Sequence, residues 1–453
     1  MEDMTIEPTK VAVIGAGSAQ FGLNTVAALL RSDRLRGSHL ALVDRDPAAL
    51  ERMARLAERL DAEWGAGMTI TSHTHHETAL PGTAFVVSAI EVAPREALWR
   101  SDFDIGLRHG VRQPYAENGG PGGFAHALRN IGPVLEIARS MEVHCPDAWF
   151  VNFSNPMIRI CDAIHRHSRI RVVGLCHQVD VGYRMVGTVL AADLGIDLAG
   201  PPIHHQARAR LDIVAAGVNH CTWALEIRDR ATGEDLYPLF RERWASHAPS
   251  YEPLTRDVFA AFGRFPMTGD SHLSEYLPWV SDPVTRPWER YGIPLYDWDG
   301  MAQLRGVGHD AIDAMGRGTA PIDALRETDS EGALEMVEHL AGAGRHEHQA
   351  VNVPNDGLIA NLPDGAIVEV PGTVTDAGVA GRVVGPLPEG ITELCRRELT
   401  VVRTVVDAAV HGDRDLALQA LLLDPVVRDL EVARALLDDY LETYRAYLPQ
   451  FWD

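Results

Sequence analysis

The sequence is poor in cysteine and in positive charge, and it has no long apolar run. Its five cysteines, an odd number without close paired spacing, favour a reduced cytosolic setting over a disulfide framework. Lys and Arg number 41 against 63 Asp and Glu, and the net charge of −22 argues against nucleic acid or an anionic membrane as a partner. No run is long enough to span a bilayer, and the N-terminal stretch lacks the order of a signal peptide. We therefore expect a cytoplasmic enzyme that acts on a small molecule.

The length of the chain predicts two domains, because 453 residues exceed what one compact core usually holds. Strand-like runs alternate with helical patterns up to about residue 200, which predicts a parallel sheet with helices on both faces. We predict an α/β fold in which residues 1–200 form a Rossmann-like, NAD-binding domain similar to that of lactate and malate dehydrogenases. Residues 201–453 are predicted to form a second, α+β domain for substrate and metal, ending in helices.

The stretch "KVAVIGAGSAQFG", residues 10–22, has the order strand, glycine turn, helix. Such a turn lets backbone N–H groups and a helix N-terminus face a pyrophosphate, although the third glycine of the usual fingerprint is missing here. A second strand-like run ends in Asp44, 29 residues after Gly15, where a carboxylate can accept hydrogen bonds from ribose hydroxyls and so favours NAD over NADP. The predicted cofactor-binding residues are Gly15, Gly17, Ser18, Phe21 and Asp44.

Polar residues follow several of the predicted strands. Asn155 lies in "FVNFSNPM", Cys176 and His177 in "GLCHQ", and His220 interrupts an apolar run in "AAGVNH", where we expect a bulge or turn. Thiolate and imidazole suit a divalent transition metal. Residue type alone still favours a simpler interpretation of Cys176 and His220, as a buried thiol and a hydrogen-bonded core histidine. A redox thiol would lack a C-x-x-C partner, and a nucleophile would lack a base and its orienting group.

Several motifs in order along the chain resemble those of glycoside hydrolase family 4, the NAD- and metal-dependent glycosidases. They are "KVAVIGAGSAQF", "ENGGPGGFAHALRNI", "FVNFSNPM", "GLCHQV", "AAGVNH", "GDSHLSEYLPW" and "VNVPNDGLIANLPDGAIVEVP". The resemblance implies that Cys176 and His220 hold Mn²⁺ or another divalent ion and that Asn155 lies between sugar and cofactor. It also implies a homodimer or homotetramer.

The resemblance further implies an unphosphorylated α-glycoside as substrate. Family members with histidine directly after the metal-binding cysteine act on such sugars, and His177 stands there in this chain. The next residue, Gln178, differs from the serine of galactosidase-like members and the glutamate of uronidase-like members, so the sugar itself stays open.

The reaction implied by the family differs from that of ordinary glycosidases, which use paired carboxylates. NAD oxidises C3 of the sugar, a base removes the C2 proton, the C1–O bond breaks by elimination, water adds, and NADH returns the hydride. The motif "GDSHLSEYLPW" offers Asp270, His272, Glu275 and Tyr276. Of these, Asp270 is the predicted base, while Tyr276 and Tyr296 are alternatives. A helix-capping role for Asp270 is nearly as plausible locally.

Sugar contacts are predicted for His177, which is also expected to assist departure of the leaving group, and for Asn118 with its neighbour Glu117. Locally, His177 could instead orient the metal site, and the loop residues could serve turn chemistry. His204 and His205 follow "GPP" and are interpreted as loop residues. Two other functions compete with a glycosidase: an NAD-dependent dehydrogenase of the lactate/malate type, and a non-catalytic NAD-binding regulator.

Overall fold

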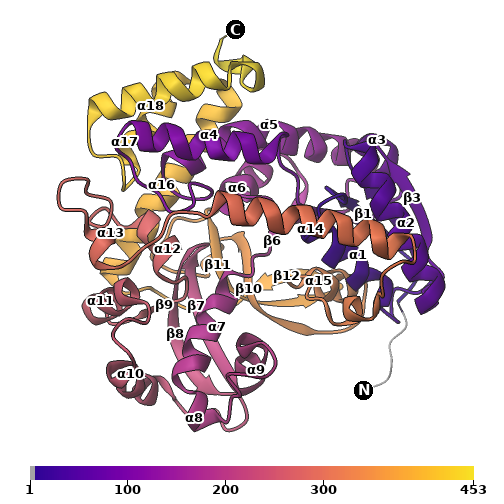
Figure 1. The fold of residues 1–453 in the computed structure, drawn as a ribbon, viewed down its shortest axis with the longest axis horizontal. Helices are drawn as coiled ribbons and strands as arrows, with labels where there is room; N and C mark the ends of the chain where they lie inside the picture. Colours follow the sequence, from indigo (N-terminus) through magenta and orange to yellow (C-terminus); the bar gives the residue numbers. More distant parts are fainter. Residues whose placement is uncertain (1–5, 453) are drawn as a thin grey trace.

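The computed structural model describes residues 6–452, and a single mixed sheet of twelve strands runs through them (Figure 1). The strand order is β3-β2-β1-β4-β5-β6-β10-β11-β7-β8-β9, and β12 pairs with β11. The strands are β1 (Lys10–Ile14), β2 (His39–Val43), β3 (Thr69–His73), β4 (Phe85–Ser88), β5 (Trp149–Asn152), β6 (Arg171–Gly174), β7 (Leu211–Val218), β8 (Cys221–Asp229), β9 (Phe265–Pro266), β10 (His346–Pro354), β11 (Ile367–Thr375) and β12 (Gly378–Gly381).

The first six strands are parallel and form a dinucleotide-binding type of sheet with the order 3-2-1-4-5-6. Strands such as "VAVI" and "FVVS" are buried, as is usual when helices cover both faces of a parallel sheet. The predicted α/β fold is therefore confirmed. The helices of this half are α1 (Phe21–Arg31), α2 (Pro47–Trp64), α3 (His76–Ala79), α4 (Arg95–Arg108), α5 (Gly120–His144), α6 (Met157–His167), α7 (Gln178–Val189) and α8 (Ala191–Leu194).

The strands from the second half of the chain extend the same sheet. β10 joins β6 through the pair Asn352 and Gly174, and the strands beyond it are antiparallel. The sheet thus includes strands from both sides of residue 200. The division into residues 1–200 and 201–453 stays a prediction. The helices here are α9 (Ile203–Arg210), α10 (Tyr237–Ser246), α11 (Pro253–Phe262), α12 (Asp270–Leu273), α13 (Pro287–Arg290), α14 (Trp298–Gly316), α15 (Ala333–Leu340), α16 (Glu389–His411), α17 (Arg414–Leu423) and α18 (Leu430–Thr443), with short 3-10 turns η1 (Ser274–Tyr276), η2 (Asp323–Glu327), η3 (Arg445–Tyr447) and η4 (Pro449–Phe451).

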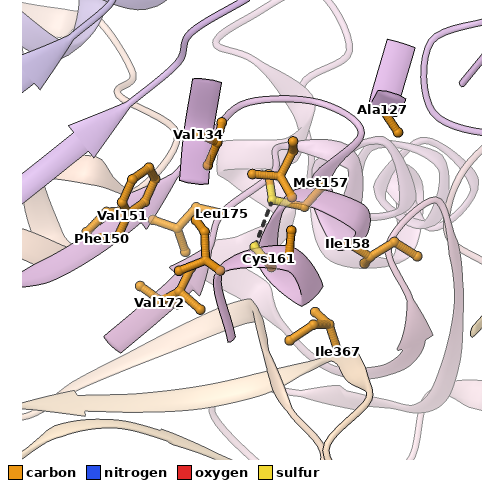
Figure 2. Close-up of a cluster of buried hydrophobic side chains, with 14 of the residues drawn as sticks. Ala127, Val134, Phe150, Val151, Met157, Ile158, Cys161, Val172, Leu175 and Ile367 are labelled. Carbon is orange, nitrogen blue, oxygen red and sulfur yellow. Dashed lines mark hydrogen bonds between the residues drawn. The ribbon is translucent and has the colours of Figure 1, made fainter. Parts of the chain in front are cut away.

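The two halves share one hydrophobic core. Figure 2 shows Val134 of α5, Phe150 of β5 and Met157 of α6 gathered with Ile367 of β11, and all four are buried. The C-terminal helices return to the first half of the chain, where α17 contacts α5 and α18 contacts α4 (Figure 1).

All five cysteines are free thiols. None of the helices among the described residues combines the length and the apolar character that crossing a bilayer requires.

Candidate active site

The glycine turn after β1 packs closely against the backbone that follows β4. Gly15 has φ +89, and a Cβ there would lie 2.6 Å from the carbonyl oxygen of Ala89. The amide of Gly17 donates to Asp44 Oδ2 at 2.8 Å, which ties the turn to the end of β2. Helix α1 begins at Phe21 without a side-chain cap and without an acidic residue in its first turn. The amides of Leu23 and Asn24 donate to the carbonyl oxygens of Ser18 and Gln20, which leaves those of Phe21 and Gly22 to face an anion.

Cys176 and His220 are 44 residues apart in sequence, and the fold brings their side chains together. Cys176 follows β6, and His220 lies in the two-residue turn between β7 and β8, so the predicted turn is present. The distance from Cys176 Sγ to His220 Nε2 is 3.5 Å. Two such donors on one tetrahedral cation, with bonds of about 2.3 and 2.1 Å, would lie about 3.6 Å apart. The pair is therefore spaced as metal ligands are.

The protonation of the two side chains also suits a metal ion. Burial, and next the nearby Glu369, raise the pKa of the Cys176 thiol well above its ordinary value. Burial, and next the neighbouring His272 and His177, lower the pKa of His220, which keeps its imidazole neutral. A buried thiol of this kind loses its proton when a cation takes the proton's place, and a neutral imidazole is the form that binds metals.

Two buried histidine nitrogens at this pair have no hydrogen-bond partner among the described residues. They are Nδ1 of His220 itself and Nδ1 of His272. The His272 ring lies 4.3 Å from the His220 ring and stacks on Tyr115 at 4.2 Å. Buried polar atoms are usually hydrogen-bonded in folded proteins, so these two unpaired nitrogens beside a thiol are free to bind a polar ligand.

A fully buried carboxylate lies behind the pair and was not predicted from the sequence. Glu369 of β11 accepts hydrogen bonds from Asn219 Nδ2 at 2.9 Å, from Asn352 Nδ2 at 3.1 Å and from the Thr222 hydroxyl. Lys, Arg and His side chains of the described residues form no ion pair with it, although 34 such pairs occur elsewhere. A glutamate inside the apolar run "AIVEV" was the available signal.

His177 lies at the edge of the site and is bonded to a second glutamate that the sequence did not predict. His177 Nδ1 is 3.0 Å from Glu331 Oε2, and this hydrogen bond raises the pKa of His177 to about 9. Glu331 has φ +56, a backbone conformation that side chains other than glycine rarely adopt. Both residues line a cavity of about 350 Å³ that also reaches Cys176 and His348. The geometry leaves His177 Nε2 available for a ligand.

Asp270, the predicted base, has structural contacts, and its role as base stays a prediction. Its two carboxylate oxygens accept hydrogen bonds from the amides of Leu254 (2.9 Å) and Thr255 (2.7 Å), at the start of α11. Burial raises the pKa of Asp270 to about 6. His272 is two positions further along α12, on the opposite side of a helical turn, and it is His272 that faces His220.

Two other predicted residues also have structural contacts. The Tyr276 side chain is buried, and burial raises its pKa well above the ordinary value, which makes the phenol a poor base. Asn118 Oδ1 accepts the amide of Met157 at 3.3 Å and so joins the glycine-rich loop to the start of α6. The neighbouring carboxylate of Glu275 holds the same loop by accepting the amides of Tyr115 and Ala116.

Known proteins resemble this chain over nearly its whole length. The model "Family 4 glycosyl hydrolase" matches residues 10–191, and "Family 4 glycosyl hydrolase C-terminal domain" matches residues 215–427. The α-glucosidase of Erwinia rhapontici is 30 % identical over 97 % of this chain and 99 % of its own.

Solved structures show the same fold. That of Bacillus subtilis lplD is 26 % identical, covers 96 % of this chain and 100 % of its own, and has a TM-score of 0.86. A 6-phospho-α-glucosidase from gut microorganisms, solved in complex with NAD and Mn²⁺, is 21 % identical, covers 98 % of this chain and 100 % of its own, and has a TM-score of 0.83.

Proposed function

Because this chain belongs to family 4 of the glycosyl hydrolases, we propose that it hydrolyses an unphosphorylated α-glycoside with NAD and a divalent metal ion as bound cofactors. The observation that carries the proposal is the approach of Cys176 Sγ to His220 Nε2, at 3.5 Å, beside the buried ring of His272. The α-glucosidase relative supports the α-linkage and an unphosphorylated sugar, and a solved structure of the same fold contains NAD and Mn²⁺.

The chain has residues that fit both cofactors. The turn at Gly15, Gly17 and Ser18 with the first amides of α1, from Phe21 on, would hold the pyrophosphate of NAD, and Asp44 would hold the ribose. Cys176 and His220 would hold the metal ion. When bound, NAD would supply reversible hydride transfer at C3 of the sugar, and the metal ion would supply Lewis-acid polarisation of the resulting ketone.

The side chains around the metal ligands would bind the sugar and move its C2 proton. Asn155 Oδ1 is unpaired and can accept a sugar hydroxyl, and Asn118 fixes the loop next to it. We assign the C2 base to His272 rather than to Asp270. Burial lowers the pKa of His272 to about 4, so its ring is neutral, and its unpaired Nδ1 can accept a proton.

His177 would act at the leaving-group side of the sugar. Its Nδ1 is fixed by Glu331, and its Nε2 can donate to the glycosidic oxygen as the C1–O bond breaks. After elimination, water would add at C1 and a proton would return to C2. The cofactor is regenerated in every turnover, so no net NADH is released.

Hydrolysis in D₂O tests this mechanism directly. The product sugar is expected to carry deuterium at C2, detectable by NMR, because the C2 proton is removed and replaced in each turnover. Glucosides, galactosides and uronides with α-linkage, assayed with Mn²⁺ and NAD, would identify the sugar. A product without C2 deuterium would contradict the mechanism, and net NADH formation would favour a dehydrogenase of the lactate/malate type.

The variant Cys176→Ser tests the metal assignment. Its hydrolysis is expected to fall at least about a hundredfold together with its affinity for Mn²⁺, since a ligand in contact with the ion is lost. The matched control is Cys145→Ser, which changes a buried cysteine outside the site. Full Mn²⁺ affinity in Cys176→Ser would overturn the assignment.

A homodimeric or homotetrameric assembly and a cytoplasmic location are also part of the proposal. Sedimentation of the native protein would measure the assembly.

A further inference from the structure

A second group of metal-binding side chains lies outside the residues assigned to the catalytic metal. His204 and His205, which the sequence places in a loop, lie in the first turn of α9, and the fold brings Asp329 to them from the segment before α15. One ligand atom of each of the three residues lies within 4.8 Å of those of the other two. His205 Nε2 is 3.2 Å from Asp329 Oδ2.

The chemistry of the three side chains is specific. Two imidazoles and one carboxylate form the donor set of sites for Zn²⁺, Co²⁺ and Ni²⁺, and three protein ligands leave a coordination position for water. Asp329 Oδ1 accepts the amide of Glu331 at 2.7 Å, which orients the carboxylate so that Oδ2 faces His205.

We propose that His204, His205 and Asp329 form a second divalent-metal site, for an ion of the zinc class, that joins α9 to the turn over residues 329–332. The proposal goes beyond the proposed function, because none of the three residues is assigned there. Glu331 lies in the same turn, in a left-handed backbone conformation, and bonds to His177. An ion at Asp329 would therefore fix the segment that orients His177.

Co²⁺ binding to the full-length chain, stripped of metal, separates the two sites. The Cys176→Ser variant lacks the thiolate of the catalytic site, so its Co²⁺ complex should have no sulfur-to-metal absorption band. We expect this variant still to bind one equivalent of Co²⁺, at the second site. Adding His205→Asn or Asp329→Asn to Cys176→Ser is expected to weaken this binding at least about tenfold. The matched control adds His75→Asn to Cys176→Ser and should keep the full affinity. His75 is exposed and follows β3, the edge strand at the end of the sheet away from β7.

Hydrogen exchange tests whether the ion joins the two segments. Zn²⁺ added to the Cys176→Ser chain is expected to slow amide exchange both at the start of α9 and over residues 328–332. The proposal is overturned if Cys176→Ser binds no Co²⁺, if the His205 and Asp329 variants bind it unchanged, or if exchange slows in neither segment. Failure of the catalytic assignment gives a different result: the sulfur-to-metal band would then be absent from the unmodified chain.

Discussion

At the scale of single residues, the fully buried carboxylate of Glu369 has three neutral hydrogen-bond donors and no cationic partner among the described residues. A buried charge without a counter-charge is unfavourable, and burial raises the pKa of Glu369 accordingly. A divalent ion held by Cys176 and His220 would supply the missing positive charge. Asn219, which donates to Glu369, directly precedes His220, so the carboxylate also positions that ligand.

The variant Glu369→Gln keeps the shape of the side chain and removes its charge. We expect two opposite effects: unchanged or higher stability of the metal-free chain, and Mn²⁺ affinity lower by about 10- to 100-fold. Thermal unfolding of the metal-free protein and calorimetric Mn²⁺ titration measure the two quantities. Glu398→Gln is the matched control, because Glu398 is buried but paired with Arg159. That change should lower stability and leave the Mn²⁺ affinity unaltered, and equal behaviour of the two variants would contradict the role of Glu369.

Motifs in the sequence identified the residues that the fold brings to one place, but they did not identify the partners of those residues. Cys176 and His220 each stand in a motif, and their approach follows from the strands that precede them. Glu331 is more than 140 residues away from His177, and Glu369 is equally far from Asn219, so no spacing in the sequence relates these partners. Asp270 and His272 share one motif, and only the direction of a helical turn distinguishes their contacts.

At the scale of elements, the junction of α11 and α12 determines what Asp270 does. Its carboxylate accepts both amides at the start of α11, and its own amide donates to Glu252 Oε2 at 2.7 Å. Anionic groups at helix N-termini stabilise a helix through these bonds and through the helix dipole. The neighbouring His272 makes no such contact, and its ring lies beside His220.

The variants Asp270→Asn and His272→Gln are therefore expected to differ in kind. Asp270→Asn should lower the free energy of unfolding by about 1–2 kcal/mol, because an amide cannot accept both bonds as a carboxylate does. His272→Gln should leave stability nearly unchanged and reduce kcat by at least about a hundredfold. Chemical unfolding and steady-state kinetics measure the two effects. Asp270→Asn with full stability and no activity would return the role of base to Asp270.

Elements were predicted best where the pattern was local. Alternating runs and glycine turns predicted β1, α1 and the other strands of the parallel half, and the polar break in "AAGVNH" predicted the turn between β7 and β8. The pairing of β6 with β10 could not be predicted, because their register is set by side chains on neighbouring strands and helices. The sequence therefore did not indicate that the strands of both halves form one continuous sheet, and the division into two domains stays a prediction.

At the scale of the whole molecule, the C-terminal helices hold the first half of the chain. The Tyr440 hydroxyl donates to the carbonyl oxygen of Asp102 at 3.1 Å, and the Tyr444 hydroxyl donates to that of Leu98 at 3.2 Å. The carboxylate of Asp102 is buried with Arg129. These contacts join α18 to α4 and α5 (Figure 1), so the two halves are expected to unfold together.

The pH dependence of that unfolding should include a buried acid between α17 and α18. Asp424 is 2 % exposed, its Oδ1 accepts the amide of Val426, and its Oδ2 has no partner among the described residues. Burial, and next Glu398, raise the pKa of Asp424 to about 7.

Between about pH 4 and pH 7 the folded chain keeps a proton on Asp424 that the unfolded chain has released. The contribution of Asp424 to the free energy of unfolding therefore falls as the pH rises through that window. Asp424→Asn should therefore stabilise the protein at pH 8 by about 1–3 kcal/mol, given about 1.4 kcal/mol per pKa unit and partial relaxation, and by much less at pH 4. Guanidinium unfolding at the two pH values measures this difference, with the exposed Asp438→Asn as control. An equal effect of Asp424→Asn at both pH values would show that the carboxyl is not protonated in the folded chain.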